Sequence, residues 1–350
     1  MPDSLNNSFR VGVIGCGRWG PNHVRVLEEI LGPGNVIACE PDRDRRVAFA
    51  TRYPHVPVHE SPELLIADSE LQAVVIATPA HTHFDLAMMA LQAGKHVLCE
   101  KPFTSTVREA EVLKAQADLK GCVLMIGHVF LYNAALAYVR TICQDGTLGT
   151  LRYAIATRTN LGPIRTDVDV AADLASHDIA VLNWVTGRVP QSVSAVGASY
   201  IVKGHADTAF ITLSYSGDFK ASVQTSWLHP EKVRQLTIVG SQRMLKWNDL
   251  DLDAPITVYD KHVETEPRSS TYGDFLRFST HTGEVRHPYV PFYEPLKAQA
   301  QAFLTAIRDG GSVQSNAESA LAVMQVLEAI AESFAGNGIP VYVQSIRPNL

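Results

Sequence analysis

Residues 10–20 read RVGVIGCGRWG, an apolar run followed by glycines at positions 15, 17 and 20. Residues 21–31 predict a helix, because Pro21 suits a first helical turn and apolar side chains recur on one face. In such a strand–loop–helix unit the first glycine permits the tight turn, the second leaves room for a phosphate, and the third lets helix and strand pack closely. The start of the helix offers N–H groups to an anion. The stretch therefore predicts a dinucleotide-binding loop made of Gly15, Gly17, Arg18, Trp19 and Gly20.

A second apolar run, residues 35–40, ends in Glu40, which follows Gly20 by 20 residues. A carboxylate at this place hydrogen-bonds the adenine ribose hydroxyls and repels a 2′-phosphate, so Glu40 favours NAD over NADP. Arginines at positions 43, 45 and 46 come directly afterwards and suit a 2′-phosphate, which keeps NADP open. A solvated helix face is the better explanation of the same arginines.

Further apolar strands are expected at residues 73–78, 96–99 and 123–126, with an amphipathic helix between the first two. Continuous apolar strands that alternate with helices indicate a parallel sheet covered on both faces. Residues 1–127 therefore predict a doubly wound Rossmann domain of the α/β class.

The pattern changes after this point, and residues 128–350 predict an α+β domain with a large open antiparallel sheet. An open sheet face needs a partner surface, so a homo-oligomer, a dimer or a tetramer, is expected. Helices are expected near residues 132–144 and 171–186, and strands at residues 191–201, 208–215, 220–227, 234–239 and 256–259.

The composition excludes several classes of protein. Lys and Arg total 30 against 36 Asp and Glu, and they are scattered, so neither nucleic acid nor a membrane is an expected partner. The first ten residues lack the apolar core of a signal peptide, so none is expected, and no apolar run is long enough to span a bilayer. Its five cysteines form no C-x-x-C pair, which indicates reduced thiols and a cytoplasmic protein.

Two segments follow predicted strands at the edge where doubly wound sheets bind ligands. The first begins with Thr78 and Pro79 and ends with His83, which is assigned to the cofactor cleft. His81 and His83 alternate as a metal pair would, but no Cys or carboxylate completes a site nearby, so no metal is expected. In the second segment, Lys101 between Glu100 and Pro102 can project its ammonium toward a reacting hydroxyl. A surface turn explains that triplet equally well.

Asp173 and His177 are four residues apart in the predicted helix 171–186. This spacing places both side chains on one face, where the carboxylate can orient the imidazole and the ring can accept a proton from a hydroxyl. The alternative is an ion pair on the helix surface, worth a few tenths of a kcal/mol. The residues alone leave both interpretations open.

Residues 15–20 (GCGRWG), 77–83 (ATPAHTH) and 93–102 (AGKHVLCEKP) together resemble the glucose–fructose oxidoreductase/inositol dehydrogenase (Gfo/Idh/MocA) family. The resemblance covers nearly the whole chain. It implies NAD(P)-dependent dehydrogenation of a sugar or polyol hydroxyl, with Lys101, Asp173 and His177 as the catalytic set and His177 as the general base. It also implies that Thr78, Pro79, His83, Glu100 and Lys101 contact the cofactor, and that the open sheet serves substrate binding and oligomerisation.

Residues 17–25 and 159–169 resemble the nucleotide-sugar branch of this family, particularly UDP-N-acetylglucosamine 3-dehydrogenases. The loop at residues 158–165 carries arginines and suits an anionic ligand, so Asn160 and Arg165 join His177 as expected substrate-binding residues. An ordinary surface loop is the alternative. A dehydrogenase of inositol or free sugars, an NAD-dependent glycosidase and a non-catalytic dinucleotide sensor also remain open, although a sensor has no need of Lys101, Asp173 and His177.

Overall fold

The computed structural model describes residues 9–268 and 275–343. The chain divides into two compact units. The first comprises Met1–Asn133 together with Tyr293–Met324, and the second comprises Ala134–Phe292 together with Gln325–Leu350. The expected boundary after residue 127 therefore falls six residues before the first division, and the segment Tyr293–Met324 groups with the first unit rather than with the second.

In the described part of the first unit, six parallel strands form a sheet in the order β3-β2-β1-β4-β5-β6. This order has its topological switch point between β1 and β4, where the chain turns from one half of the sheet to the other. The predicted doubly wound Rossmann fold is confirmed. The strands are β1 (Arg10–Ile14), β2 (Val36–Cys39), β3 (Val58–His59), β4 (Leu71–Ile76), β5 (His96–Cys99) and β6 (Leu124–Ile126).

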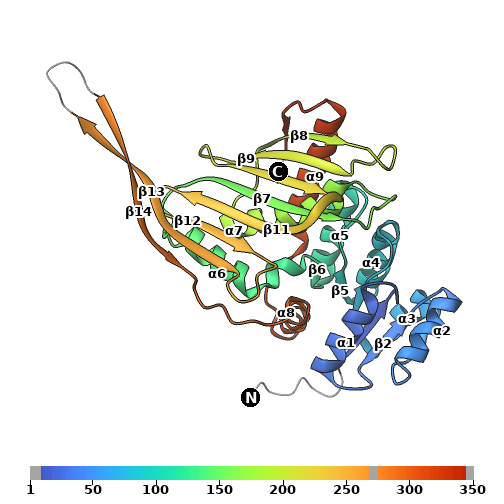
Figure 1. Cartoon of the computed structure of the whole chain (residues 1–350). Coiled ribbons are helices and arrows are strands. Elements are labelled where there is room, and N and C mark those ends of the chain that lie inside the picture. Colours follow the sequence, from blue (N-terminus) through green and yellow to red (C-terminus); the bar gives the residue numbers. More distant parts are fainter. Residues whose placement is uncertain (1–8, 269–274, 344–350) are drawn as a thin grey trace. The chain divides into compact units, whose positions relative to one another are not determined.

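Helices follow the strands of this sheet in sequence (Figure 1). Local signals start them: Thr106 accepts a hydrogen bond from the Glu109 N–H while the Glu109 carboxylate bonds back, which caps α5. Apolar side chains from α3, α4 and α5 pack with the sheet into one buried cluster. The helices are α1 (Gly20–Leu31), α2 (Arg43–Arg52), α3 (Pro62–Ala67), α4 (His83–Gln92) and α5 (Val107–Lys120), with 3₁₀ turns η1 (Ala80–Thr82) and η2 (Val129–Tyr132).

Helix α8 (Pro295–Asp309) belongs to the first unit although it comes late in the chain. Arg25 on α1 forms an ion pair with Glu294, and Lys297 forms another with Glu29 at 2.8 Å. These contacts attach α8 to α1, which is the reason why a boundary drawn along the sequence does not separate the two units.

In the described part of the second unit, nine strands form one sheet in the order β14-β13-β12-β11-β7-β10-β9-β8-β15. Its pairs are antiparallel except for β7 and β10, which run parallel. The sheet is therefore mostly antiparallel, as expected, with one exception at its centre. The strands are β7 (Leu151–Leu161), β8 (Ser192–Ala198), β9 (Thr208–Ser214), β10 (Lys220–Ser226), β11 (Leu228–Gly240), β12 (Met244–Asn248), β13 (Ile256–Arg268), β14 (Phe275–Arg286) and β15 (Val341–Tyr342).

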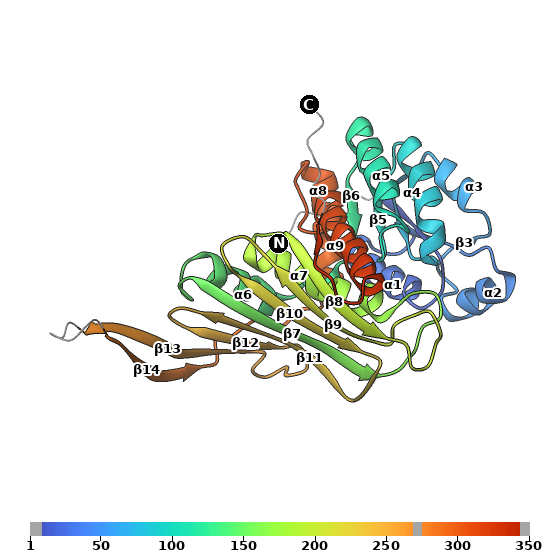
Figure 2. The ribbon, with the colours of Figure 1, turned by 90° about the horizontal axis from the view of Figure 1, so that it is seen from above.

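Helices α6 (Ala134–Gln144) and α7 (Ser176–Thr186) cover one face of this sheet (Figure 2). Among the described residues of this unit, no helix covers the opposite face, so the sheet is open as predicted. The expected helix at residues 171–186 begins with a π-helical turn, η3 (Ala171–Ala175), before it continues as α7. Single π-helical turns are frequent at functional sites. Helix α9 (Ala317–Ala335) has residues in both units.

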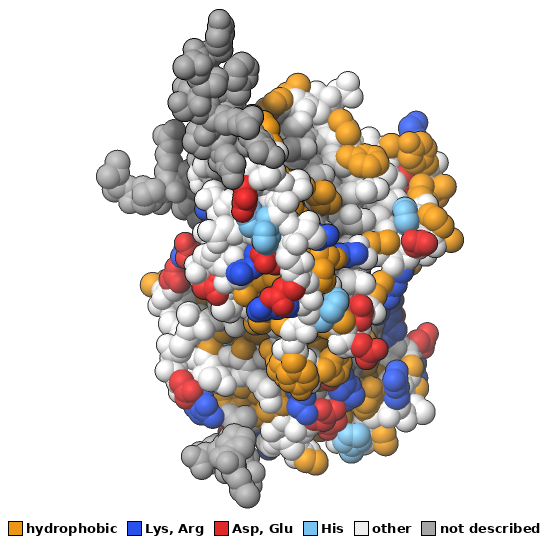
Figure 3. Space-filling model, turned by 60° about the vertical axis from the view of Figure 1, so that its left-hand side comes forward, with side chains coloured by type: hydrophobic (Ala, Val, Ile, Leu, Met, Phe, Trp, Pro, Cys, Tyr) orange, Lys and Arg blue, Asp and Glu red, His pale blue; other side chains and the backbone are white. Residues whose placement is uncertain are grey.

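The surface agrees with the charge distribution of the sequence. Figure 3 shows one face on which acidic and basic side chains are interspersed rather than separated into fields. Among the described residues, no helix has both the length and the apolar composition that a bilayer crossing requires.

Candidate active site

The glycine loop between β1 and α1 has the geometry that the three glycines predict. Gly15 has a φ of +98°, and a Cβ there would lie 2.7 Å from the carbonyl oxygen of Ala77. A Cβ at Gly20 would lie 1.8 Å from the carbonyl oxygen of Gly15, so only glycine permits this approach of helix to strand. A Cβ at Gly17 would meet nothing within 4 Å among the described residues. Gly17 therefore borders open space, and the absence of a side chain there leaves room for a phosphate to approach the backbone.

The first turn of α1 begins directly after this loop. Trp19 occupies its N-cap position without a capping hydrogen bond from the side chain, and Pro21 lies in the first turn. Arg18 and Trp19 are exposed beside it. The partial positive charge of a helix start favours an anion, so the loop and α1 suit the pyrophosphate of a dinucleotide.

Glu40 is buried at the end of β2 and contacts the glycine loop. Its Oε2 atom accepts a hydrogen bond from the Cys16 N–H at 2.9 Å, and Oε1 accepts one from the Asp42 N–H at 3.1 Å. These two bonds fix the carboxylate beside the loop, where the sequence places the ribose ligand. Burial and the charge of Glu40 raise the pKa of the Cys16 thiol to about 12, so this thiol stays protonated at neutral pH.

Arg46, one of the arginines that would suit a 2′-phosphate of NADP, contacts the protein itself. It donates to the carbonyl oxygens of Glu40 and Pro41 at 2.7 and 2.9 Å, and it contacts Glu60 at 3.2 Å. Its guanidinium therefore helps to close the turn after β2. Arg43 and Arg45 are exposed on α2, in agreement with a solvated helix face.

His83 is buried at the start of α4, and its expected contact with the cofactor stays a prediction. The side chain is 1% exposed, with Nδ1 2.8 Å from the carbonyl oxygen of Pro102 and Nε2 3.0 Å from that of Thr78. The imidazole thus ties the segment after β4 to the segment after β5. Thr78 is half-buried and Pro79 is exposed at the switch point, and the Thr78 hydroxyl accepts a hydrogen bond from Thr82.

Glu100 and Lys101 follow β5, with a cis peptide bond between Lys101 and Pro102. Glu100 accepts a hydrogen bond from His23, whose Nε2 lies 2.8 Å from Oε1, and a weaker one from the Lys101 N–H at 3.3 Å. His23 is 1% exposed on α1. No motif in the sequence singled out His23, although its position three residues after Gly20 marks the buried side of α1.

His128 is a second buried histidine of this unit that no sequence motif indicates. Burial, and to a smaller extent the charge of Lys101, lower the pKa of His128 to about 4. Its Nδ1 has no hydrogen-bond partner among the described residues. A neutral imidazole therefore lies near the lysine that the sequence selects for catalysis.

In the second unit, Asp173 lies on the π-helical turn η3 and accepts hydrogen bonds on both oxygens. Oδ1 lies 3.2 Å from a guanidinium nitrogen of Arg165, and Oδ2 lies 3.3 Å from the indole nitrogen of Trp227. His177 is half-buried on α7. The hydrogen bond expected between Asp173 and His177 stays a prediction.

The expected loop at residues 158–165 begins later, because β7 continues to Leu161 and carries Arg158 and Asn160. Arg158 and Arg165 both form ion pairs with carboxylates. Arg165 is held by Asp167 at 2.9 Å and also contacts Asp173, so its guanidinium helps to position the Asp173 carboxylate. Its expected contact with a substrate stays a prediction. Arg158 is buried and forms a bidentate ion pair with Asp178, at 2.8 and 2.9 Å. Asn160 donates its side-chain amide to the carbonyl oxygen of Gly162 and shapes the turn after β7.

Two family models match the chain. Residues 9–128 match the oxidoreductase family with an NAD-binding Rossmann fold, and residues 136–246 match the GFO/IDH/MocA C-terminal domain. The UDP-N-acetylglucosamine 3-dehydrogenase of Acidithiobacillus ferrooxidans is 35% identical over 261 residues, which cover 74% of this chain and 79% of that protein. Inositol 2-dehydrogenase 2 of Saccharopolyspora erythraea is 30% identical over 186 residues, 52% of this chain and 55% of that protein.

Solved structures agree with these matches. The Acidithiobacillus ferrooxidans enzyme superposes with a TM-score of 0.78 and 27% identity, over 93% of this chain and 98% of that one. A levoglucosan dehydrogenase in complex with NADH has a TM-score of 0.79 at 20% identity, over 97% and 100% of the two chains, and shares the fold. The chain therefore belongs to the GFO/IDH/MocA family of NAD-binding oxidoreductases.

Proposed function

We propose that this oxidoreductase oxidises a hydroxyl group of a sugar ring to a ketone. The proposed substrate is a UDP-N-acetylhexosamine, and the proposed position of oxidation is C3. The observation that carries the proposal is the 35% identity to a UDP-N-acetylglucosamine 3-dehydrogenase over 74% of this chain. An inositol or a free sugar is the second candidate substrate, because an inositol 2-dehydrogenase is 30% identical over 52% of the chain.

Lys101, Asp173 and His177 are proposed to handle the proton. Bound NAD supplies the acceptor for the hydride that the carbinol carbon loses. Lys101 is proposed to hold the hydroxyl oxygen and to offset the alkoxide charge that develops on it. His177 then takes the hydroxyl proton, and Asp173 keeps the imidazole oriented. The carboxylate of Asp173 is itself fixed by Arg165 and Trp227, which supports a positioning role for it.

Glu40 is proposed to select NAD. Its buried carboxylate is anchored to the loop through the Cys16 N–H at 2.9 Å, and each carboxylate oxygen has further lone pairs for the ribose hydroxyls. A 2′-phosphate would meet this negative charge at close range. The five cysteines are free thiols, which supports a reducing compartment such as the cytoplasm.

The test is NADH formation with a panel of UDP-N-acetylhexosamines, free sugars and inositols. We expect turnover with UDP-N-acetylglucosamine, and turnover with inositol alone would favour the second candidate. A sugar product released without net NADH would indicate a glycosidase, which recycles its cofactor, and no reaction with any compound would indicate a dinucleotide sensor.

The variant His177→Ala tests the assignment of the base. We expect turnover to fall by roughly 100- to 10,000-fold, because a positioned general base contributes about that much. NADH binding, followed by its fluorescence, is expected to stay unchanged. The control is His55→Ala, an exposed histidine paired with Glu28 in the first unit, which is expected to retain full turnover. Near-normal turnover of His177→Ala would remove His177 from the mechanism.

A homo-oligomer formed through the open sheet face is part of the proposal. Ile155, Val196 and Phe210 are 45%, 46% and 53% exposed on strands β7, β8 and β9, and Val196 lies opposite Phe210 in the strand register. Apolar side chains that gather on a sheet face favour a partner surface. We expect Phe210→Glu to lower the mass measured by light scattering, whereas Leu119→Glu, on the exposed side of α5, leaves it unchanged. A Phe210→Glu protein with the wild-type mass would exclude this face.

A further inference from the structure

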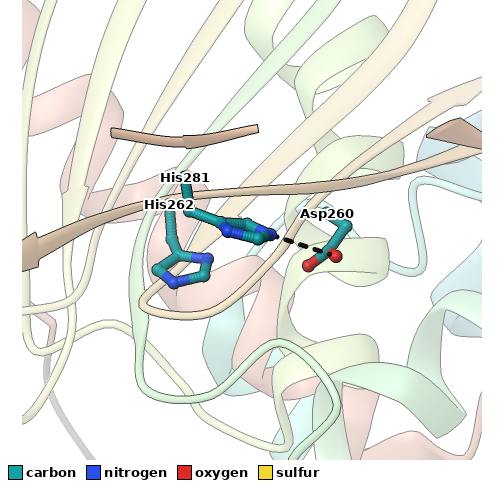
Figure 4. A group of neighbouring side chains, drawn as sticks. All are labelled: Asp260, His262 and His281. Carbon is teal, nitrogen blue, oxygen red and sulfur yellow. Dashed lines mark hydrogen bonds and ion pairs between the residues drawn. The ribbon is translucent and has the colours of Figure 1, made fainter. Parts of the chain in front are cut away.

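Three potential metal ligands converge on the hairpin of β13 and β14, outside all the residues discussed above. Asp260 and His262 lie two residues apart on β13, and His281 on β14 is the cross-strand partner of His262. Among the described residues, these are the side chains whose ligand atoms form a group of three within 4.8 Å of one another. Figure 4 shows both imidazole rings and the carboxylate turned toward one another.

The strand pairing brings the two histidines together, and Asp260 lies beside them at a register shift between Tyr259 and Lys261. Side chains of directly opposed residues in an antiparallel pair lie on the same face, with Cβ atoms about 5 Å apart. The rings of His262 and His281 accordingly stack with centroids 4.6 Å apart. Nε2 of His281 lies 3.3 Å from Oδ2 of Asp260, the contact drawn as a dashed line in Figure 4.

The contacts of His262 favour the tautomer that a metal ligand requires, with one ring nitrogen free of its proton. Its Nε2 lies 3.3 Å from the Glu264 carboxylate, which can only accept a hydrogen bond, so the proton is on Nε2. Nδ1 then carries the lone pair, and it is buried without a hydrogen-bond partner among the described residues. A histidine ligand that donates its other nitrogen to a carboxylate is the usual arrangement in metal sites.

Asp260 is positioned by its neighbours as well. Its other oxygen, Oδ1, lies 3.6 Å from Nε of Arg243. Oδ2 therefore faces the histidines, 3.3 Å from Nε2 of His281. Gly283 makes room for the carboxylate, because a Cβ there would lie 2.4 Å from Oδ2. The side chains of Asp260 and His281 are 30% and 40% exposed, so an ion from solvent has access.

We propose that Asp260, His262 and His281 bind a divalent transition-metal ion, Zn²⁺ in the first place, with water completing the coordination. Two imidazole nitrogens and one carboxylate oxygen suit Zn²⁺ rather than Mg²⁺ or Ca²⁺, which prefer oxygen ligands. Tetrahedral Zn²⁺ needs ligand atoms roughly 3.3 Å apart, so small side-chain rotations from the present separations are sufficient. The ion would cross-link β13 to β14.

The test is a Zn²⁺ titration of the metal-free full-length protein, in competition with a chromophoric chelator. We expect one ion per chain with a Kd in the micromolar range or below. His262→Gln and His281→Gln are each expected to weaken binding at least tenfold. Glu264→Gln is expected to weaken it about tenfold, as loss of a carboxylate that orients a ligand typically does. Mg²⁺ is expected not to compete.

The control is His55→Gln, which removes another histidine–carboxylate pair, at 3.0 Å, where the described residues offer no third ligand. It is expected to bind Zn²⁺ as the wild type does. Circular dichroism checks that each variant is folded. If a histidine variant unfolds, the Zn²⁺ affinity of Glu264→Gln, a change at a half-exposed position, still tests the site. The proposal is overturned if the wild type binds no stoichiometric Zn²⁺, or if the three hairpin variants bind it as tightly as His55→Gln does.

Discussion

Nε2 of His23 on α1 lies 2.8 Å from Oε1 of Glu100, the residue that precedes Lys101. The helix that begins at the glycine loop is thereby joined to the strand end that carries the proposed catalytic lysine. Both groups are buried or nearly so, with side chains 2% and 12% exposed. A hydrogen bond to a carboxylate in such surroundings fixes position more strongly than one at the surface.

The variant His23→Ala tests this relationship. Without the imidazole, the buried Glu100 carboxylate loses a partner, which costs about 1–3 kcal/mol of stability. We expect a lower midpoint of thermal unfolding and a lower kcat, because Lys101 follows Glu100 directly. His23→Gln keeps an N–H donor and is expected to recover part of both. A variant His23→Ala with wild-type kcat would show that the pair serves stability alone.

The variant Glu40→Gln tests the selection of NAD. Losing the charge on a ribose ligand is expected to raise the Kd of NADH about tenfold, since a hydrogen bond to a charged group contributes about 1.5 kcal/mol or more. The Kd of NADPH is expected to fall, because the repulsion of its 2′-phosphate is gone. Fluorescence titration measures both. Glu60→Gln, an exposed acid beside Arg46, is the control and is expected to change neither Kd. Unchanged affinities in Glu40→Gln would exclude Glu40 as the ribose ligand.

Short-range signals predicted the first unit well. The turn at Gly15 and the close packing at Gly20 follow from backbone geometry alone, so the motif identifies them without any knowledge of distant residues. Glu40 could be found for the same reason, because a strand end fixes where its side chain begins. The role of His83 could not be predicted: its two carbonyl partners, on Thr78 and Pro102, come together only when β4 and β5 pair.

Long-range pairing explains what was missed in the second unit. The parallel pairing of β7 with β10 joins strands that are more than 50 residues apart, and no local pattern encodes it. The cluster of Asp260, His262 and His281 depends on the register of β13 with β14, and the sequence separation of the histidines does not reveal it. The ion pairs of Arg165 with Asp167 and Asp173 were not predicted either, and the expected contact of Arg165 with an anionic ligand stays a prediction.

His128 is expected to make stability depend on pH. Burial lowers its pKa to about 4 in the folded chain, below the value of about 6.5 expected after unfolding. Between these two values only the unfolded chain binds the proton, so stability is full above the upper value and decreases as the pH falls. The slope approaches about 1.4 kcal/mol per pH unit in this interval. The measurement is the midpoint of thermal unfolding of the wild type and of His128→Asn at several pH values in this interval. Identical pH dependence in both proteins would contradict this assignment.

The buried pair of Arg158 and Asp178 is expected to be the most sensitive ion pair of the second unit. Asp178→Asn removes the carboxylate that pairs with the guanidinium of Arg158, in a site where both side chains are 3–5% exposed, and breaking such a buried pair costs about 3–5 kcal/mol. Asp167→Asn is the matched control: it removes the partner of Arg165 at 33% and 59% exposure, where an ion pair contributes at most about 1 kcal/mol. Denaturant unfolding measures the loss of stability in both variants.

A double variant tests the physical reason for this loss. Because the cost comes from the positive charge that remains buried, Arg158→Met/Asp178→Leu is expected to recover most of the lost stability. A double variant as unstable as Asp178→Asn would show that geometry, not charge, makes the pair indispensable.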